Sequence, residues 1–280
     1  MIEPVLADEA FLEDVHRAAA SKEVLHLWWL GQSGFLVQWQ GAHLLLDPYL
    51  ADSLTRKYAG TEKPHVRMTR RVVDPQWLDF VDVVTSTHNH TDHLDGETLV
   101  SLLGANPALV VLVSEANREF AANRLKVAPE RLTGITGEAP VTVGPFTFHA
   151  IPSAHESLET DSLGNHKFIG FVVQAGQWTI YHSGDAAPYD GWAENLRPFR
   201  IDIALLPVNG RDPQRGVPGN LSGQEAVELA AAIGADLCIP MHYDMFEFNT
   251  VTPSAFRQAA RWKGQAFQIL KCGERVSVRK

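Results

Sequence analysis

The first quarter of the chain combines one helical pattern with three short apolar runs. Residues 9–23 (EAFLEDVHRAAASKE) carry apolar side chains at the spacing of an amphipathic helix, within an N-terminal helical segment that spans residues 1–23. Three β-type runs follow at residues 24–30, 35–40 and 43–47, and the turn residues GQSG and GA separate them. This pattern predicts a helix followed by a meander of three strands.

Two polar stretches interrupt the apolar pattern. Residues 48–71 are unpatterned and include LTRKYAGTEKPH, which carries four basic residues, and residues 153–167 form the second stretch. Long loops without regular structure often border functional sites. We therefore expect the first stretch to be a surface loop, either simply solvated or placed beside a site.

Strands and helices alternate through the rest of the chain. Helical patterns cover residues 95–103, 115–126, 222–234 and 253–264, and the third begins with the capping-box pair Ser222 and Glu225 and ends at Gly234. Two β-rich halves with helices on their outer faces predict an α/β (α+β) fold in which two sheets stack as a four-layer αββα sandwich. The remaining expected strands are residues 81–87, 108–114, 141–144, 146–152, 168–176, 178–185, 201–208, 235–242 and 266–270.

Composition limits the classes of partner. With 280 residues, 45% of them hydrophobic, and no Pro/Ser-rich linker or block of charge, the chain is expected to form one domain over residues 1–280. The net charge of -9 and the absence of clustered Lys and Arg argue against nucleic-acid binding. A small-molecule substrate is the expected partner, and any anionic substrate must be attracted locally.

The amino-terminal pattern predicts a cytoplasmic location. The first residues lack the basic, apolar and small-residue order of a signal peptide, and no apolar run is long enough to span a bilayer. The two cysteines, Cys238 and Cys272, have neither ligand spacing nor a disulfide framework, which fits a reducing compartment.

The densest group of polar residues follows the apolar run at residues 81–87. His88, His90, Asp92 and His93 form the pattern H-x-H-x-D-H where this strand is expected to end. Side chains two apart in a strand share a face, so His88 and His90 can hold one ion, and a turn carries Asp92 and His93 to a second position. Imidazole and carboxylate suit zinc, manganese and iron. A polar strand end without metal is the alternative, at the cost of solvating or hydrogen-bonding three imidazoles.

Three further candidate ligands follow other expected strands. His155 lies in IPSAHES, Asp185 in YHSGDA and His242 in IPMHYD, each directly after an apolar β-run. We expect them to converge with H-x-H-x-D-H on one rim of the sheets. Taken singly, each is explained equally well as a loop residue.

H-x-H-x-D-H followed along the chain by His155, Asp185 and His242 resembles the signature of the metallo-β-lactamase superfamily. The resemblance implies an αββα sandwich of the metallo-β-lactamase type with a binuclear metal site. It also matches LLLDP to an early aspartate motif, which implies that Asp47 supports a ligand without binding an ion. The implied ligands are His88, His90 and His155 for one ion, Asp92, His93 and His242 for the other, and Asp185 as the bridge.

Within this superfamily, the chain is most similar to the L-ascorbate-6-phosphate lactonase group. The similarity rests on WWLGQSGFLV, STHNHTDHLD, IYHSGD and IPMHYDMF. The chain departs from the group by offering His155 where the group has an aspartate, and by lacking its longer loops and carboxyl-terminal extension. These departures concern the substrate pocket. The resemblance further implies a homo-oligomer, because the lactonases assemble from subunits.

Two bound ions predict hydrolytic chemistry. A metal lowers the pKa of bound water from 15.7 to about 7, Asp185 would hold the resulting hydroxide between the ions, and the second ion would stabilise the oxyanion that forms. Either Asp92 or a metal-bound water would protonate the leaving group. The preferred function is a metal-dependent hydrolase that opens a small polar lactone or ester, with or without a phosphate group.

Two other functions stay open at this point. A phosphodiesterase of the N-acylphosphatidylethanolamine phospholipase D type shares related motifs, and Trp28 and Trp29 would support its hydrophobic approach only weakly, since core packing explains them equally well. A non-hydrolytic role in metal binding or redox chemistry is the other. A flavodiiron oxidase would carry a flavin domain and a glutamate in the metal motif, and neither is visible.

Several residues near these motifs have candidate supporting roles. His182 is expected to pack beside Asp185 or to orient it. Arg211 and Arg215, in the loop PVNGRDPQRGVPGN, are candidate contacts for an anionic group of the substrate, with a solvated loop as the alternative. The other histidines are interpreted as core or surface residues, namely His16, His26, His43, His65, His149 and His166.

Overall fold

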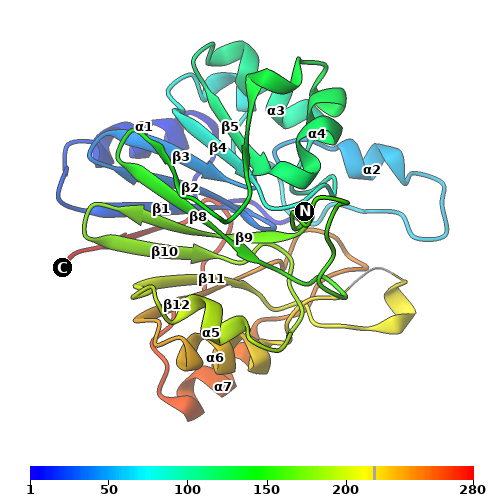
Figure 1. The fold of residues 1–280 in the computed structure, drawn as a ribbon, viewed down its shortest axis with the longest axis vertical. Coiled ribbons are helices and arrows are strands. Elements are labelled where there is room, and N and C mark those ends of the chain that lie inside the picture. Colours follow the sequence, from blue (N-terminus) through cyan, green and yellow to red (C-terminus); the bar gives the residue numbers. More distant parts are fainter. Residues whose placement is uncertain (217–218) are drawn as a thin grey trace.

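Two β-sheets packed face to face form the centre of the molecule, and helices cover both outer faces (Figure 1). The computed structural model describes residues 1–216 and 219–280. The four-layer αββα sandwich predicted from the sequence is confirmed. The helices are α1 (Asp8–Ala18), α2 (Ser53–Lys57), α3 (Gly96–Ala105), α4 (Arg118–Leu125), α5 (Trp192–Leu196), α6 (Gly223–Ala232) and α7 (Ser254–Lys263).

The first sheet is mixed. Its strands are β1 (Leu25–Gly31), β2 (Gly34–Trp39), β3 (Ala42–Leu46), β4 (Val83–Ser86), β5 (Val110–Ser114), β6 (Leu132–Ile135) and β13 (Arg275–Val278). They lie in the order β13-β1-β2-β3-β4-β5-β6, antiparallel from β13 to β3 and parallel from β3 to β6. Helices α1, α3 and α4 lie on the outer side of this sheet (Figure 1).

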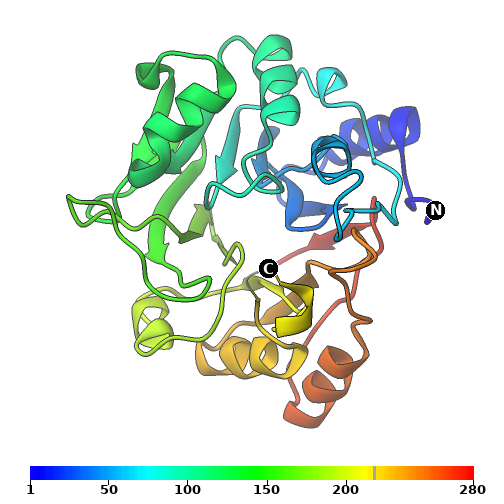
Figure 2. The same ribbon diagram turned by 90° about the vertical axis from the view of Figure 1, so that its right-hand side faces the viewer.

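The second sheet also has an antiparallel part and a parallel part. Its strands are β7 (Val141–Val143), β8 (Phe146–Pro152), β9 (Ile169–Ala175), β10 (Trp178–His182), β11 (Ile203–Pro207) and β12 (Leu237–Met241). They lie in the order β12-β11-β10-β9-β8-β7, with β7 to β10 antiparallel and β10 to β12 parallel. Helices α5, α6 and α7 cover the outer face, and Figure 2 looks onto the edge where α2 lies.

The apolar runs form strands because helices or the facing sheet cover them on both sides. Every residue of β1 is buried, which explains why this run is hydrophobic at nearly every position, with His26 as the polar exception, and does not alternate. Helix α1 packs Phe11 and Val15 into the core, and the indole Nε1 of Trp28 donates a hydrogen bond to Asp14 Oδ2 over 2.9 Å. Helix α6 begins with the predicted capping box of Ser222 and Glu225.

Four local expectations differ from the structure. Residues 266–270 form only a single bridge, between Phe267 and Cys238, and the chain closes instead with β13, which pairs with β1. The stretch 48–71 contains the short helix α2, and neither α5 nor β6 was expected. Helices α2 and α5 and strands β6 and β13 are only four or five residues long, which is too short for a distinctive periodic pattern. Short 3₁₀ helices occupy Pro75–Trp77, Glu115–Asn117, Pro129–Arg131 and Pro213–Arg215.

Within the described residues, none of the helices has the length and hydrophobicity that crossing a membrane requires.

The buried ring of His43 should make folding stability depend on pH. Burial lowers the pKa of His43 to about 4, and the ring packs edge-on against Phe80. The unfolded chain takes up a proton near pH 6.5, whereas the folded chain keeps the ring neutral until the pH approaches 4. As the pH falls through this window, His43 should therefore remove about 3 kcal/mol from the free energy of unfolding.

The test is urea unfolding of the wild type and His43→Phe between pH 8 and pH 4, both with chelator present. Phe keeps the apolar contact but cannot take up a proton, so its free energy of unfolding should fall less steeply below pH 6.5. Above pH 7 the two proteins should differ by a constant. Parallel curves over the whole range would contradict the assignment.

Candidate metal centre

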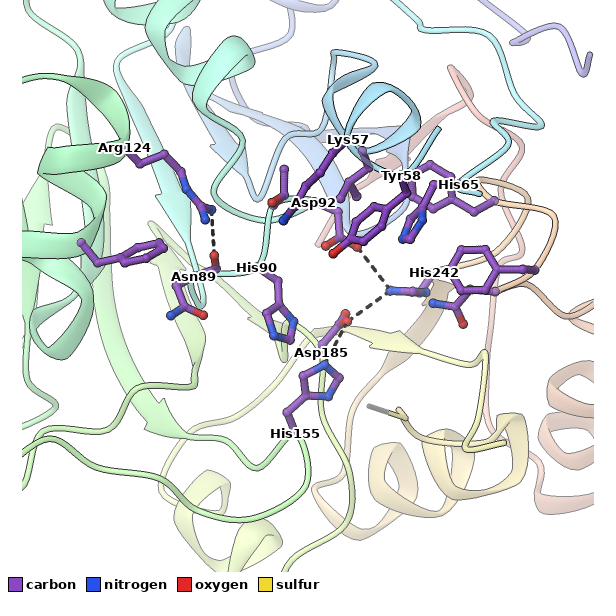
Figure 3. A pocket seen from close by; sticks show the side chains of 16 residues that line it. Lys57, Tyr58, His65, Asn89, His90, Asp92, Arg124, His155, Asp185 and His242 are labelled. Carbon is purple, nitrogen blue, oxygen red and sulfur yellow. Dashed lines mark hydrogen bonds and ion pairs between the residues drawn. The ribbon is translucent and has the colours of Figure 1, made fainter. Parts of the chain in front are cut away.

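The carboxyl ends of four strands bring polar side chains to one edge of the two sheets. H-x-H-x-D-H follows β4, and His155, Asp185 and His242 follow β8, β10 and β12. All seven predicted residues come together there (Figure 3 shows those that face the cavity). They form two groups, His88, His90 and His155 in one and Asp92, His93, Asp185 and His242 in the other, and within each group the candidate ligand atoms lie within 4.8 Å of one another.

The first group consists of three imidazoles. The ring centroids of His88 and His90 are 4.6 Å apart, and those of His90 and His155 are 5.1 Å apart. Burial lowers the pKa of all three rings, and that of His88 falls well below its usual value. The group is therefore three neutral rings, the protonation state in which imidazole binds a metal.

The second group contains both carboxylates. Asp185 Oδ1 lies 3.1 Å from His93 Nε2, and Asp185 Oδ2 lies 3.2 Å from His242 Nε2. Burial opposes charge on His93, Asp92 and Asp185, yet the two carboxylates raise the pKa of His93 well above its usual value. In return, His242 and His93 hold the pKa of Asp185 well below its usual range. The group thus keeps ionised carboxylates in a buried place.

The carboxylate of Asp185 joins the two groups. Its Oδ2 atom lies 3.7 Å from His155 Nε2 in the first group, in addition to its contacts with His93 and His242 in the second. It is the position expected of a bridging carboxylate. Asp185 lies three residues beyond β10, where the chain turns at Gly184.

The donor set fits divalent ions. The buried Nε2 atom of His88 has no hydrogen-bond partner within the described residues. Buried polar atoms are rarely left without a partner, and those that are call for an explanation such as an ion. Neutral imidazoles together with carboxylates are the ligands that zinc, manganese and iron accept.

Asp47 lies behind the second group, as expected of a supporting residue. It is fully buried at the end of β3 and accepts hydrogen bonds from Thr87 N over 3.0 Å and from Thr85 Oγ1 over 3.3 Å. His93 Nδ1 lies 2.7 Å from Asp47 Oδ2. Because the carboxylate fixes the proton on Nδ1, His93 turns its Nε2 toward the other members of the group.

Among the described residues, His182 is linked to the centre through the turn between β1 and β2 of the facing sheet. Its Nε2 lies 2.8 Å from the carbonyl oxygen of Ser33, and Ser33 Oγ lies 3.5 Å from Asp185 Oδ1. His182 is therefore a structural residue that holds the turn beside Asp185.

A side chain that sequence reasoning missed lies in the same turn. The side-chain Nε2 of Gln32 is 2.8 Å from Asp92 Oδ2 and 2.9 Å from His242 Nε2. The segment GQSG had been read only as the separator of two strands. Its place inside WWLGQSGFLV, one of the four stretches on which the family resemblance rests, was the available signal.

An open cavity of about 350 Å³ lies over the two groups. Lys57, Tyr58 and His65 form one wall, so the polar stretch 48–71 borders this cavity (Figure 3). His65, interpreted from sequence as a core or surface residue, instead stacks on Tyr58 with ring centroids 4.2 Å apart. The cavity is lined by Leu54, Lys57, Tyr58, His65, Asn89, His90, Thr91, Asp92, Phe120, Arg124, His155, Asp185, His242, Phe246, Phe248 and Asn249.

The two arginines predicted to contact an anionic substrate lie elsewhere. Arg211 pairs with Glu225 of α6 and donates to Asn220 O over 2.9 Å. Arg215 donates to Asn209 O over 2.6 Å and lines a separate surface hollow. Residues 217–218 of this loop lie outside the described residues. A role for either arginine toward substrate stays a prediction.

Comparison with known proteins identifies similar chains. Residues 26–242 match the family model described as beta-lactamase superfamily domain. A UPF0173 metal-dependent hydrolase of Opitutus terrae is 30% identical over 91% of this chain and 100% of its own length. Among solved structures, a metallo hydrolase of Ignicoccus hospitalis, Igni18, aligns with TM-score 0.68 at 18% identity over 92% of this chain and 99% of its own. An isothiocyanate hydrolase from Delia radicum gut bacteria aligns with TM-score 0.70 at 21% identity over 90% and 98%.

Proposed function

The chain belongs to the UPF0173 metal-dependent hydrolases of the beta-lactamase superfamily, and from this membership we propose that it hydrolyses a small polar lactone or ester at a centre of two divalent ions. The observation that carries the proposal is the carboxylate of Asp185, which contacts both groups of histidines at the floor of an open cavity. Zinc, manganese and iron all suit these ligands.

The proposal assigns each side chain to ligand binding, and Asp92 also to proton transfer. When bound, the ions supply activated water and stabilise the negative charge that develops on the substrate oxygen. Asp92 lines the cavity, so its carboxylate is the candidate to pass a proton to the leaving group. The ligands proposed are His88, His90 and His155 for the first ion, Asp92, His93 and His242 for the second, and Asp185 for both.

The cavity supports a small and polar substrate. Its volume of about 350 Å³ suits a compact molecule. The amine of Lys57 has no carboxylate partner among the described residues and lies on the wall of the cavity (Figure 3). Arg124, in contrast, donates to Asn89 O and Leu94 O over 2.8 and 3.0 Å and so holds the motif backbone in place. The lactones of the L-ascorbate-6-phosphate type suggested by the sequence resemblance are the first substrates to test.

The test combines metal analysis with a substrate panel. Protein purified without added metal should contain about two ions per chain by mass spectrometry, and it should open lactones in a reaction that chelation abolishes and added metal restores. The panel also includes an isothiocyanate, the substrate class named for one structural neighbour, and bis(p-nitrophenyl) phosphate. Phosphodiester cleavage without lactone cleavage would replace the proposal by the phosphodiesterase, and a chain that neither holds metal nor gains activity from it would refute both.

A further inference from the structure

The turn between β1 and β2 is buried, although most tight turns face solvent. Gln32 and Ser33 at its tip are 1% and 0% exposed. Gln32 adopts a left-handed backbone conformation with φ of +51°, which is uncommon for a residue with a side chain. Strained backbone of this kind persists only where the surroundings enforce it, and it often marks a functional site.

Two hydrogen bonds fix the backbone of this turn against the centre. The carbonyl oxygen of Gln32 accepts from the indole Nε1 of Trp29 over 3.0 Å and from the backbone N–H of His242 over 2.9 Å. The second bond ties the turn to a proposed metal ligand. The side chain of Gln32 is thereby aimed at the second group.

The amide of Gln32 contacts two members of the second group. An ionised carboxylate only accepts hydrogen bonds, so the end of the amide that lies 2.8 Å from Asp92 Oδ2 must be the donor Nε2. The same nitrogen is 2.9 Å from His242 Nε2. A ring nitrogen that binds an ion cannot also accept a hydrogen bond, so the lasting partner is Asp92.

We infer that Gln32 is a positioning residue for the second ion: its amide N–H holds the carboxylate of Asp92 in the orientation that binds metal. The inference rests on the two-ion centre of the proposed function. The amide touches Asp92 and His242, both of the second group. Gln32 therefore sets the affinity for one ion of the pair and leaves the other unaffected.

The experiment titrates metal-free protein with zinc in competition with a chromophoric chelator. Gln32→Met keeps the approximate size of the side chain and removes the donor, so one of the two binding steps should weaken by about 10- to 100-fold while the other is unchanged. Gln38→Met is the matched control, because Gln38 is equally buried at 1% exposure in the adjoining strand and contacts His43 instead of the centre. Gln38→Met should bind zinc in both steps with the affinities of the wild type.

The outcomes separate this inference from the proposed function. A wild type that binds fewer than two ions would overturn both. A wild type that binds two ions, with Gln32→Met losing neither ion or weakening both equally, would overturn only the role of Gln32. Gln32→Ala replaces Gln32→Met if the latter does not fold. In an Asp92→Ala background the Gln32 substitution should have little further effect on zinc binding, and an undiminished effect would show that Gln32 does not act through Asp92.

Discussion

Asp185→Asn is expected to release both ions and to lower kcat/KM for hydrolysis by about 10³-fold. The carboxylate of Asp185 lies within 3.1 and 3.2 Å of two ring nitrogens of the second group and 3.7 Å from His155 of the first. The amide of Asn has one acceptor oxygen and no charge, so it cannot serve both groups. The measurement is metal content per chain by mass spectrometry, together with kinetics on the substrate that the wild type hydrolyses.

The control is Asp202→Asn. Asp202 is also buried, at 2% exposure, but it accepts a hydrogen bond from Thr179 N and pairs with Lys280 away from the centre. This variant should keep both ions and its activity even if it is less stable. If Asp185→Asn retained two ions, the carboxylate would not be the bridge, whatever the loss of rate.

Gly184→Ala should destabilise the fold by about 3 kcal/mol, the sum of a left-handed conformation and overpacking, and should reduce metal content. Gly184 has φ of +61°, and a Cβ atom there would lie 2.7 Å from Thr87 Cβ. Thr87 cannot easily move away, because two hydrogen bonds hold its backbone. Its N–H donates to Asp47 Oδ1 over 3.0 Å, and its carbonyl oxygen accepts from the N–H of Ile169 over 3.2 Å. Moving Thr87 would disturb Asp47 and the His88 that follows Thr87 in sequence. Urea unfolding and metal analysis measure the two effects.

Gly144→Ala separates the cost of the left-handed backbone conformation from the cost of overpacking. Gly144 has φ of +55°, close to that of Gly184, but an added Cβ there would meet nothing within 4 Å. This variant should lose only the conformational part, about 1–2 kcal/mol, and should bind metal normally. Equal losses in the two variants would mean that the packing of Gly184 against Thr87 is not tight.

Several central strands could be predicted from sequence because their residues are buried on both faces. Strand β11 is apolar throughout, and β1 and β9 are nearly so, because helices and the opposite sheet cover them. Strand β13 was missed because RVSV is short and partly polar, and only its pairing with β1 makes it a strand. Such distant pairing leaves no local pattern in the sequence.

The candidate ligands could be predicted because each lies in a short polar motif directly after an apolar strand. The individual residues that form the cavity wall could not be predicted. Tyr58 and His65 stack beside the centre because Thr55 Oγ1 holds the carbonyl of His65 over 2.7 Å, a contact made only after the loop has folded. The pairing of Arg211 with Glu225 was also not predicted, because the sequence pattern assigns Glu225 only to the helix cap, whereas in the structure it forms an ion pair as well. Side-chain pairing of this kind depends on how loops meet in space.

The division of the ligands between the two sheets fixes when the centre can form during synthesis on the ribosome. H-x-H-x-D-H follows β4 of the first sheet, whereas His155, Asp185 and His242 follow strands of the second sheet, which are translated later. A nascent chain that ends before β12 lacks His242 and therefore offers an incomplete second group, to which an ion would bind weakly and exchange readily. The second ion of the proposed centre would therefore be selected by the folded protein from the ions available after release.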